Sequence, residues 1–503
     1  MKKIIQTLLI AAALTSCNKL DLEPDGAITT GQFFQTETDA VAAINGVYQS
    51  LTYTAGEQAL YGRNLYFLTD MGTDYAAAGA SASNFHVQSI SKLSIDENND
   101  RVALVWKQLY NGINRANIAI DNIPKVNGDE TLKARLRNEA KFIRALLYYN
   151  AVRLWSDVPL VLHAPDELDS KTLKVGRTPK EEVYAQIISD LTDAQSLPPT
   201  YAAADKGRPT SGSAYALLAD VYLTRKDYSN ATKTAKYIID NASTWGYQLV
   251  DNFGDLFAKY DKKNGPEHIF SVQFEDGQGG TPGASGQTLT ATSYYGPSGV
   301  EPPDVSSSDD VVYNRFAEGD TRKGVSYIKY VINENGDTAF TFPRALFIKY
   351  VPDLSIIYRT HPVNFPVIRY SEVLLIYAEA LNEENATPPA EAYEAINQVR
   401  RRAFGELPYA TPSSKSGVDL SELDKEGFRK AVQDERLFEF VQEGKRWFDL
   451  VRWGILEEAI KDVTYNGQKI KSAVSKRSYL YPIPQEQRDL NPVGLWQNTG
   501  YGE

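Results

Sequence analysis

The chain is poor in the residues that most often build disulfides and metal sites. It has one cysteine, Cys17, and four histidines in 503 residues. A single cysteine excludes an internal disulfide. The histidines, at 86, 163, 268 and 361, are scattered, and none has the H-E-x-x-H spacing of a zinc helix. The sequence therefore predicts no metal centre built on histidine or cysteine.

The chain also lacks an excess of positive charge. It has 53 Lys and Arg against 64 Asp and Glu, for a formal net charge of -11. Phosphate backbones and anionic lipid surfaces repel an acidic protein, so nucleic acid is not predicted as a partner. The apolar fraction of 42% and mean hydropathy of -0.38 are typical of a globular protein.

Long hydrophobic runs are scarce, and the clearest is Ile4–Leu14 at the N-terminus. It is too short to span a bilayer, which takes about 20 apolar residues. Two lysines precede it and the letters LTSC end it at Cys17, a pattern typical of a lipoprotein export signal. We predict a signal peptide over 1–16, a lipid on Cys17, a tether over 17–26 and one body over 27–503. Acyl chains would hold that body at a membrane surface.

Most of the body has helical periodicity. The expected helices are 38–52, 101–123, 131–155, 180–197, 211–226, 229–242, 366–384, 389–403 and 425–453. Tyr215, Leu218, Ala219, Tyr222 and Ala231 have the spacing of a tetratricopeptide repeat, a pair of packed helices. Two further pairs are expected, 114–123 with 132–155 and 372–382 with 392–402. Such pairs bury their apolar faces only by stacking, so the predicted fold is mainly α, a scaffold of tetratricopeptide-like helix pairs.

Charged residues are dense in two of these helices. The segment 434–454 alternates apolar and charged residues, which predicts a core helix with ion pairs along a solvated rim. Gly444 within it predicts a close backbone approach or a break in the helix. Arg400, Arg401 and Arg402 point in different directions on a helix, so separate ion pairs are favoured over one anion site.

Two stretches interrupt the helical pattern, at about 56–99 and 245–362. The second contains strand-like runs at 268–274, 325–331 and 345–350 and a hairpin signal at Asn335-Gly336. Small β elements and irregular loops are thus expected as insertions in the helical scaffold. Long loops on a rigid scaffold commonly carry binding sites.

Four segments resemble the signatures of one family and follow one another in the family's order. They are FPVIRYSEVLLIYAEALNE at 365–383, AINQVRRRA at 395–403, DERLFEFVQEGKRWFDLVRWG at 434–454 and YPIPQEQRDLNPVGLWQNTGY at 481–501. With its lipoprotein-like N-terminus, the chain resembles the SusD/RagB family of outer-membrane nutrient-binding lipoproteins over essentially its whole length.

The resemblance implies a function and a set of candidate ligand residues. Family members capture a glycan at the cell surface and deliver it to a SusC-type TonB-dependent transporter, which the helical repeats contact. The insertions form the ligand face. Aromatic rings for stacking on a sugar are then Tyr75, Phe85, Tyr294 and Tyr295, and side chains for its hydroxyls are Asp70, Asp74 and Asn84.

Catalytic motifs are not found. No G-x-S-x-G elbow occurs, and the glycine-rich segment 277–286 lacks the Lys-Ser/Thr of a phosphate loop. We therefore predict a binding protein without catalytic residues or a cofactor. Loop carboxylates such as Asp304, Asp309 and Asp310 could bind calcium, but they do not have the spacing of an EF-hand. Three alternatives stay open: capture of a peptide or glycopeptide, a surface glycosidase using two of the many carboxylates, and a structural partner of the transporter.

Overall fold

The computed structural model describes most of the body. The described residues are 33–52, 59–79, 82–165, 174–257, 262–274, 306–332, 338–350, 363–410, 416–471 and 473–502. Cys17, Tyr294 and Tyr295 lie outside them. No helix among these residues is both long enough and apolar enough to cross a membrane.

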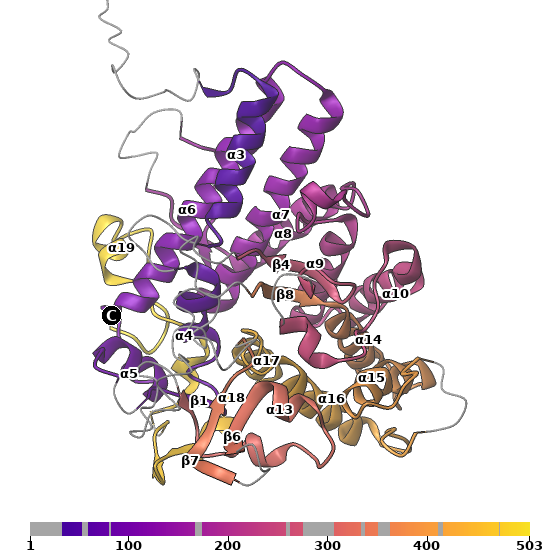
Figure 1. Cartoon of the computed structure of the whole chain (residues 1–503). Helices are drawn as coiled ribbons and strands as arrows, with labels where there is room; N and C mark the ends of the chain where they lie inside the picture. Colours follow the sequence, from indigo (N-terminus) through magenta and orange to yellow (C-terminus); the bar gives the residue numbers. More distant parts are fainter. Residues whose placement is uncertain are drawn as a thin grey trace, which may run out of the picture.

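Helices dominate the structure (Figure 1). The long helices are α3 (Glu37–Gln49), α6 (Asp100–Asn122), α7 (Glu130–Trp155), α8 (Lys180–Ala194), α9 (Ser211–Thr224), α10 (Tyr228–Trp245), α14 (Tyr370–Glu384), α15 (Ala390–Ala403), α16 (Lys425–Phe440) and α17 (Arg446–Trp453). The predicted mainly α fold is confirmed. Two boundaries differ from the prediction, because Phe365–Arg369 forms a strand and residues 441–445 separate α16 from α17.

Side-chain caps fix where several helices begin. Thr36 and Thr210 form capping boxes at the starts of α3 and α9, and Asp129 and Asp227 accept backbone N–H groups at the starts of α7 and α10. Each cap satisfies a donor that the first helical turn leaves unpaired. Gly246 ends α10 in the left-handed region, with φ of 74°, which glycine adopts without strain.

The helices stack as successive antiparallel neighbours. Packed pairs are α6–α7, α7–α8, α8–α9, α9–α10, α10–α14 and α14–α15. At the α9–α10 contact, Ala219, Ala231 and Ala235 are completely buried. Small side chains there let the two helices approach closely. The three helix pairs expected from the sequence are therefore present.

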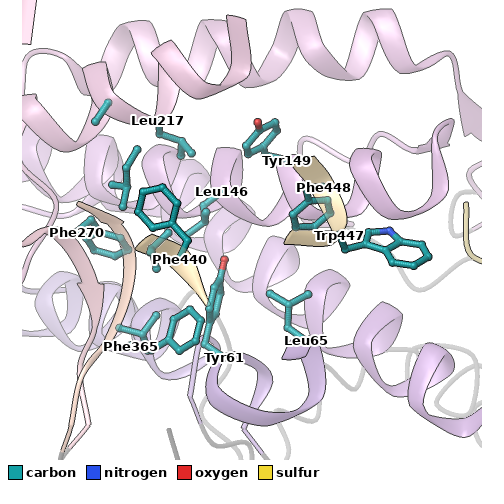
Figure 2. Packing of buried hydrophobic residues seen from close by; sticks show 14 of the residues in the cluster. Tyr61, Leu65, Leu146, Tyr149, Leu217, Phe270, Phe365, Phe440, Trp447 and Phe448 are labelled. Carbon is teal, nitrogen blue, oxygen red and sulfur yellow. The ribbon is translucent and has the colours of Figure 1, made fainter. Parts of the chain in front are cut away.

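One hydrophobic core joins the repeats to the insertions (Figure 2). Leu146 of α7 and Leu217 of α9 are buried in the same cluster as Phe270, which lies in the second interrupted stretch. Tyr61, from the first stretch, packs its ring 5.7 Å from that of Phe365. Phe448 of α17 belongs to the same cluster. The core thus fixes both insertions against the helical scaffold.

Short elements make up the rest of the described chain. The short helices are η1 (Leu60–Asn64), α4 (Leu65–Thr69), α5 (Phe85–Lys92), η2 (Ile123–Lys125), η3 (Ala203–Asp205), η4 (Phe253–Phe257), η6 (Tyr313–Arg315), α13 (Arg322–Ser326), α18 (Leu456–Ile460), η7 (Lys476–Tyr479) and α19 (Gln485–Leu490). Two-residue strands pair as β2 (Val158–Pro159) with β3 (Arg177–Thr178) and β9 (Thr464–Tyr465) with β10 (Gln468–Lys469). Strand β4 (His268–Val272) pairs antiparallel with β8 (Phe365–Arg369), and β6 (Tyr327–Ile332) with β7 (Thr338–Phe347). The strand-like runs of the sequence correspond to β4, β6 and the end of β7. The hairpin signal Asn335-Gly336 lies between β6 and β7, outside the described residues.

The expected solvated rim of 434–454 is wrong. Glu435, Arg436, Glu439, Arg446 and Asp449 are all buried, between 0% and 7% exposed. They form ion pairs with one another and with residues of α14, β8 and the insertions. Sequence periodicity predicts that charged residues on the outer face of a helix point into solvent. In the structure, each of these charges is instead paired with an opposite charge inside the protein.

Gly444 breaks the helix and also allows a close approach. Its φ is 71°, a left-handed conformation, and a Cβ atom there would lie 3.3 Å from Oγ1 of Thr69. The predicted break in the helix is therefore present, but the groups that come close to Gly444 are the side chains of Thr69 and Phe365 and not another backbone. The three consecutive arginines have different acidic partners, as predicted: Arg400 contacts Glu435, Arg401 contacts Glu394 and Asp419, and Arg402 contacts Glu267 and Glu439.

Candidate functional site

The two interrupted stretches meet through a short sheet. Strand β1 (Ala76–Ala77) pairs antiparallel with β5 (Ser306–Ser307). Just beyond it, Ser308 donates from its backbone N to Tyr75 O at 2.9 Å and from Oγ to Asp74 O at 2.8 Å. Strand β5 also lies against β7. We call the surface formed by β1, β5, α5 and the β6–β7 pair the insertion face; its elements lie together at the lower left of Figure 1.

Phe85 is the described candidate ring that this face exposes. It is the first residue of α5 and 65% exposed, and the ring of His86 lies edge-on to it at 5.7 Å. Asn84 precedes it as the helix cap, and its Oδ1 accepts from the backbone N of His86 at 2.8 Å and of Val87 at 3.1 Å. Because the helix cap occupies this oxygen, the side-chain Nδ2 of Asn84 is the group that can donate to a ligand hydroxyl.

Tyr75 is not a surface ring. It is 1% exposed, its hydroxyl donates to Asp70, and its ring packs edge-on against Phe347 at 5.9 Å. Gln442 donates its backbone N to the same hydroxyl at 3.1 Å. In this structure Tyr75 joins the insertion to the α16–α17 junction, and its ring offers no face to a ligand.

Asp70 and Asp74 are also structural in this conformation. Asp70 is completely buried and accepts from Thr69 Oγ1 at 2.6 Å. Asp74 is 4% exposed and binds Arg446 at 2.6 and 3.0 Å. Both carboxylates are committed to protein donors, so their expected contacts with ligand hydroxyls are not supported.

The carboxylates considered for calcium have protein partners too. Asp309 accepts from the backbone N of Asn466 at 2.9 Å and of Gly467 at 2.7 Å. Asp310 binds Lys329 Nζ at 2.6 Å and the backbone N of Ala345 at 2.6 Å. Asp304 lies outside the described residues. Within the ranges given above, no three His, Cys, Asp or Glu side chains are grouped to hold a metal ion.

Tyr330 is an exposed ring that sequence reasoning missed. It lies on β6, is 48% exposed and pairs in register with Thr341 of β7. Tyr327, three residues earlier, is buried at 4%. Strand periodicity places residues three apart on opposite faces, so this signal could have identified Tyr330 once the strand was recognised.

A buried lysine holds the insertion face in place. Lys471 Nζ donates to the carbonyl oxygens of Met71 at 2.7 Å, Ala76 at 3.0 Å and Ser91 at 3.1 Å. These acceptors lie before β1, in β1 and in α5. Burial lowers the pKa of Lys471 to about 7, while nearby Asp74 opposes the shift. No spacing or motif around Lys471 indicates this role from sequence.

Comparison with known proteins identifies the family. The family model described as the SusD family matches residues 292–501, and that described as "Starch-binding associating with outer membrane" matches residues 20–223. Residues 1–18 match a prokaryotic membrane lipoprotein lipid attachment site, which supports the prediction at Cys17. The SusD-like protein P2 of Formosa agariphila is 30% identical over the full length of both chains.

Solved structures agree with these matches. A SusD homolog from Bacteroides thetaiotaomicron superposes with a TM-score of 0.77 at 26% identity, covering 94% of this chain and 98% of its own. A laminarin-binding SusD-like protein superposes with a TM-score of 0.74 at 25% identity, covering 93% and 100%. The chain belongs to the SusD/RagB family.

Proposed function

We propose that this chain is a lipid-anchored outer-membrane protein that binds an oligosaccharide or polysaccharide on its insertion face. It would pass the bound saccharide to a SusC-type TonB-dependent transporter without cleaving it. The observation that carries the proposal is an exposed ring, Phe85, at the junction of the two insertions of a SusD-family scaffold. Tyr330 adds a second exposed ring on the adjoining β6–β7 pair.

The chemistry of the face supports a saccharide. Aromatic rings present large, rigid surfaces with little entropy to lose on binding, and these suit the apolar face of a sugar ring. The similar proteins include a laminarin-binding SusD-like protein and the starch-binding protein SusD of Bacteroides thetaiotaomicron, so laminarin and starch are the first polysaccharides to test. The buried core beneath the face, with Tyr75 and Lys471 tied to neighbouring backbone, keeps it preformed.

Retardation in native gels containing laminarin, starch or other soluble polysaccharides tests this function. The whole lipoprotein in detergent should be retarded by at least one glycan. Phe85→Ala should weaken that retention several-fold because a stacked ring is worth about 0.5 to 1.5 kcal/mol. Leu490→Ala is the matched control, since Leu490 is also 65% exposed but lies in α19.

Three outcomes would contradict the proposal. Retention of peptides but of no polysaccharide would establish the peptide or glycopeptide alternative. Release of reducing ends, abolished by one carboxylate substitution, would establish a glycosidase. Unchanged glycan retention in a Phe85→Ala, Tyr330→Ala double variant would remove the binding role of these rings. Co-purification of an outer-membrane transporter with the tagged wild-type chain tests the proposed partner separately.

A further inference from the structure

A concave surface lies on the repeat side of the molecule. A cleft of about 370 Å³ opens between the connection from α8 to α9, the end of α10 and strand β4. None of its lining residues belongs to β1, β5 or α5. Figure 1 shows α9 and α10 well separated from α5 and β1. The cleft falls within the volume range of small-molecule sites.

One wall of this cleft is aromatic. Trp245 at the end of α10 lines it and stacks on Tyr215 with ring centroids 5.9 Å apart and planes inclined by 30°. The ring of Tyr237, which is 44% exposed, lies 4.6 Å from that of Tyr215, and these two rings support Trp245 without lining the cleft themselves. Tyr247 completes the wall edge-on to Trp245 at 6.1 Å. Partly exposed rings grouped on helices of a repeat scaffold mark a surface used for recognition.

The rest of the lining is polar and includes two cations, Lys206 and Arg208. The side-chain amide of Asn264, in this cleft, bonds reciprocally at 2.8 and 3.0 Å with that of Gln273, which lines the neighbouring cleft. Thr200 and Lys206 are exposed at its mouth. Flat amides and hydroxyls beside aromatic rings suit a ligand that has hydroxyl groups and apolar ring faces.

Two buried polar atoms in the wall are unused. Ser271 is 2% exposed, and its Oγ has no hydrogen-bond partner in the described part of the chain. His268 Nε2 bonds Leu256 O at 3.1 Å, which leaves Nδ1 as an acceptor, and a Cβ on Gly265 would lie 3.9 Å from it. Burial lowers the pKa of His268 to about 4, so the ring is neutral at pH 7. Both atoms have almost no accessible surface, so they lie beneath the wall and do not contact a ligand in this conformation.

The cleft continues into a second one. The two share the loop 206–208 and Phe270 and Ser271, and the second has a volume of about 450 Å³ and includes Tyr48. Gly207, with φ of 103°, lines both clefts, and a Cβ there would lie 2.8 Å from Cδ of Gln273. Glycine therefore allows the shared loop to pack against Gln273. Two adjoining clefts suit an extended ligand better than a single small molecule.

We propose that this pair of clefts, which we call the repeat-side groove, is a second saccharide-binding site for a chain of several sugar units. The ligand class rests on the proposed function, but the surface is a different one. Two sites on one anchored protein raise retention of a long polymer through effective concentration, without tighter binding at either site.

The test compares variants of the whole lipoprotein on the polysaccharide that the wild type retains in the gel. Trp245→Ala should lower the affinity about threefold to tenfold by removing a stacking ring. Thr200→Arg places a long side chain at the mouth from an exposed position and should weaken retention without removing packed atoms. Trp496→Ala is the matched control, since Trp496 is 47% exposed and does not line the groove.

Hydrogen exchange in the Phe85→Ala background gives a second measurement. Addition of the same polysaccharide should slow exchange in residues 199–210 and 262–274. If the wild type is retained but both groove variants behave like wild type and neither segment is protected, the groove proposal is overturned and the insertion face stands. If the wild type binds no polysaccharide, the proposed function fails first. Protection of these segments by a tryptic casein digest alone would overturn the saccharide class of the groove.

Discussion

The α9–α10 pair and the α16–α17 junction are buried to a similar degree but are held together differently. The α9–α10 contact relies on apolar and small side chains, with Ala219, Ala231 and Ala235 at the crossing. The α16–α17 junction buries a charge network in which Glu439 pairs with three arginines. Burial of apolar area stabilises the first, whereas the second is stable only while each charge keeps its partner.

This difference in packing explains how the insertion face and the repeat-side groove are each supported. The buried network has cations Arg322, Lys349, Arg369 and Arg402 and carboxylates Glu267, Asp320, Glu435, Glu439 and Glu443, with partly exposed Arg400 completing the balance. It joins β8, α13 and the end of β7 to α16. Hydrogen-bonded charge pairs have strict geometry, so this region fixes the orientation of the insertions. The repeats need only matching apolar faces.

The largest expected effect is at the centre of the network. Burial alone would raise the pKa of Glu439, but Arg402, Arg369 and Arg322 hold that pKa well below its usual range. Glu439→Gln leaves these arginines short of one negative charge, which should lower the free energy of unfolding by about 3 to 5 kcal/mol. Urea denaturation measures it. The control Glu181→Gln breaks an exposed pair with Arg225 and should cost less than about 1 kcal/mol.

An equal loss in both variants would contradict the comparison, because it would mean that the buried network contributes no more than a surface ion pair. A loss under 1 kcal/mol for Glu439→Gln would have the same consequence. Unchanged glycan retention by whatever fraction of the variant stays folded would still be expected, since Glu439 lies beneath the surface at 0% exposed.

Asp70 is the opposite case in the same region, because no cation of the described residues pairs with this buried carboxylate. Burial raises its pKa to about 6, against hydrogen bonds from Thr69 and Tyr75 that lower it. The folded state therefore binds more protons than the unfolded state between pH 3.8 and 6, so this carboxylate destabilises the fold increasingly as pH rises through that window.

Asp70→Asn should remove that dependence. Relative to the variant, the wild type should lose about 2 kcal/mol of unfolding free energy between pH 4.5 and pH 7. The measurement is urea denaturation of both proteins across this range, with the difference between them cancelling all other titrating groups. A difference that stays constant with pH would show that Asp70 keeps an ordinary pKa.

The same contrast determines what the sequence could reveal. Apolar periodicity and the repeat spacing from Tyr215 to Ala231 predicted the helix pairs, because small and apolar residues at helical intervals have one stable arrangement. The environment predicted for the charges of 434–454 was wrong, because their partners in α13, β8 and α14 are distant in sequence. Tyr75 failed as a ligand residue for a similar reason. A loop position suggests exposure, but the partner of its hydroxyl, Asp70, is visible only in the fold.

The smallest of these effects sharpens the apolar side of the comparison. Ala219 is 0% exposed at the α9–α10 contact, whereas Ala185 is exposed on α8. Ala219→Leu forces extra volume between two helices and should cost about 1 to 3 kcal/mol. Ala185→Leu adds the same atoms in solvent and should change the unfolding free energy by less than about 0.5 kcal/mol. Thermal denaturation of both variants at one pH measures the difference.

If Ala219→Leu proved as mild as Ala185→Leu, close approach of α9 and α10 would not be what the small residue provides. The repeat side would then tolerate altered packing, while the charged junction, with its fixed pairing, would remain the rigid part of the molecule.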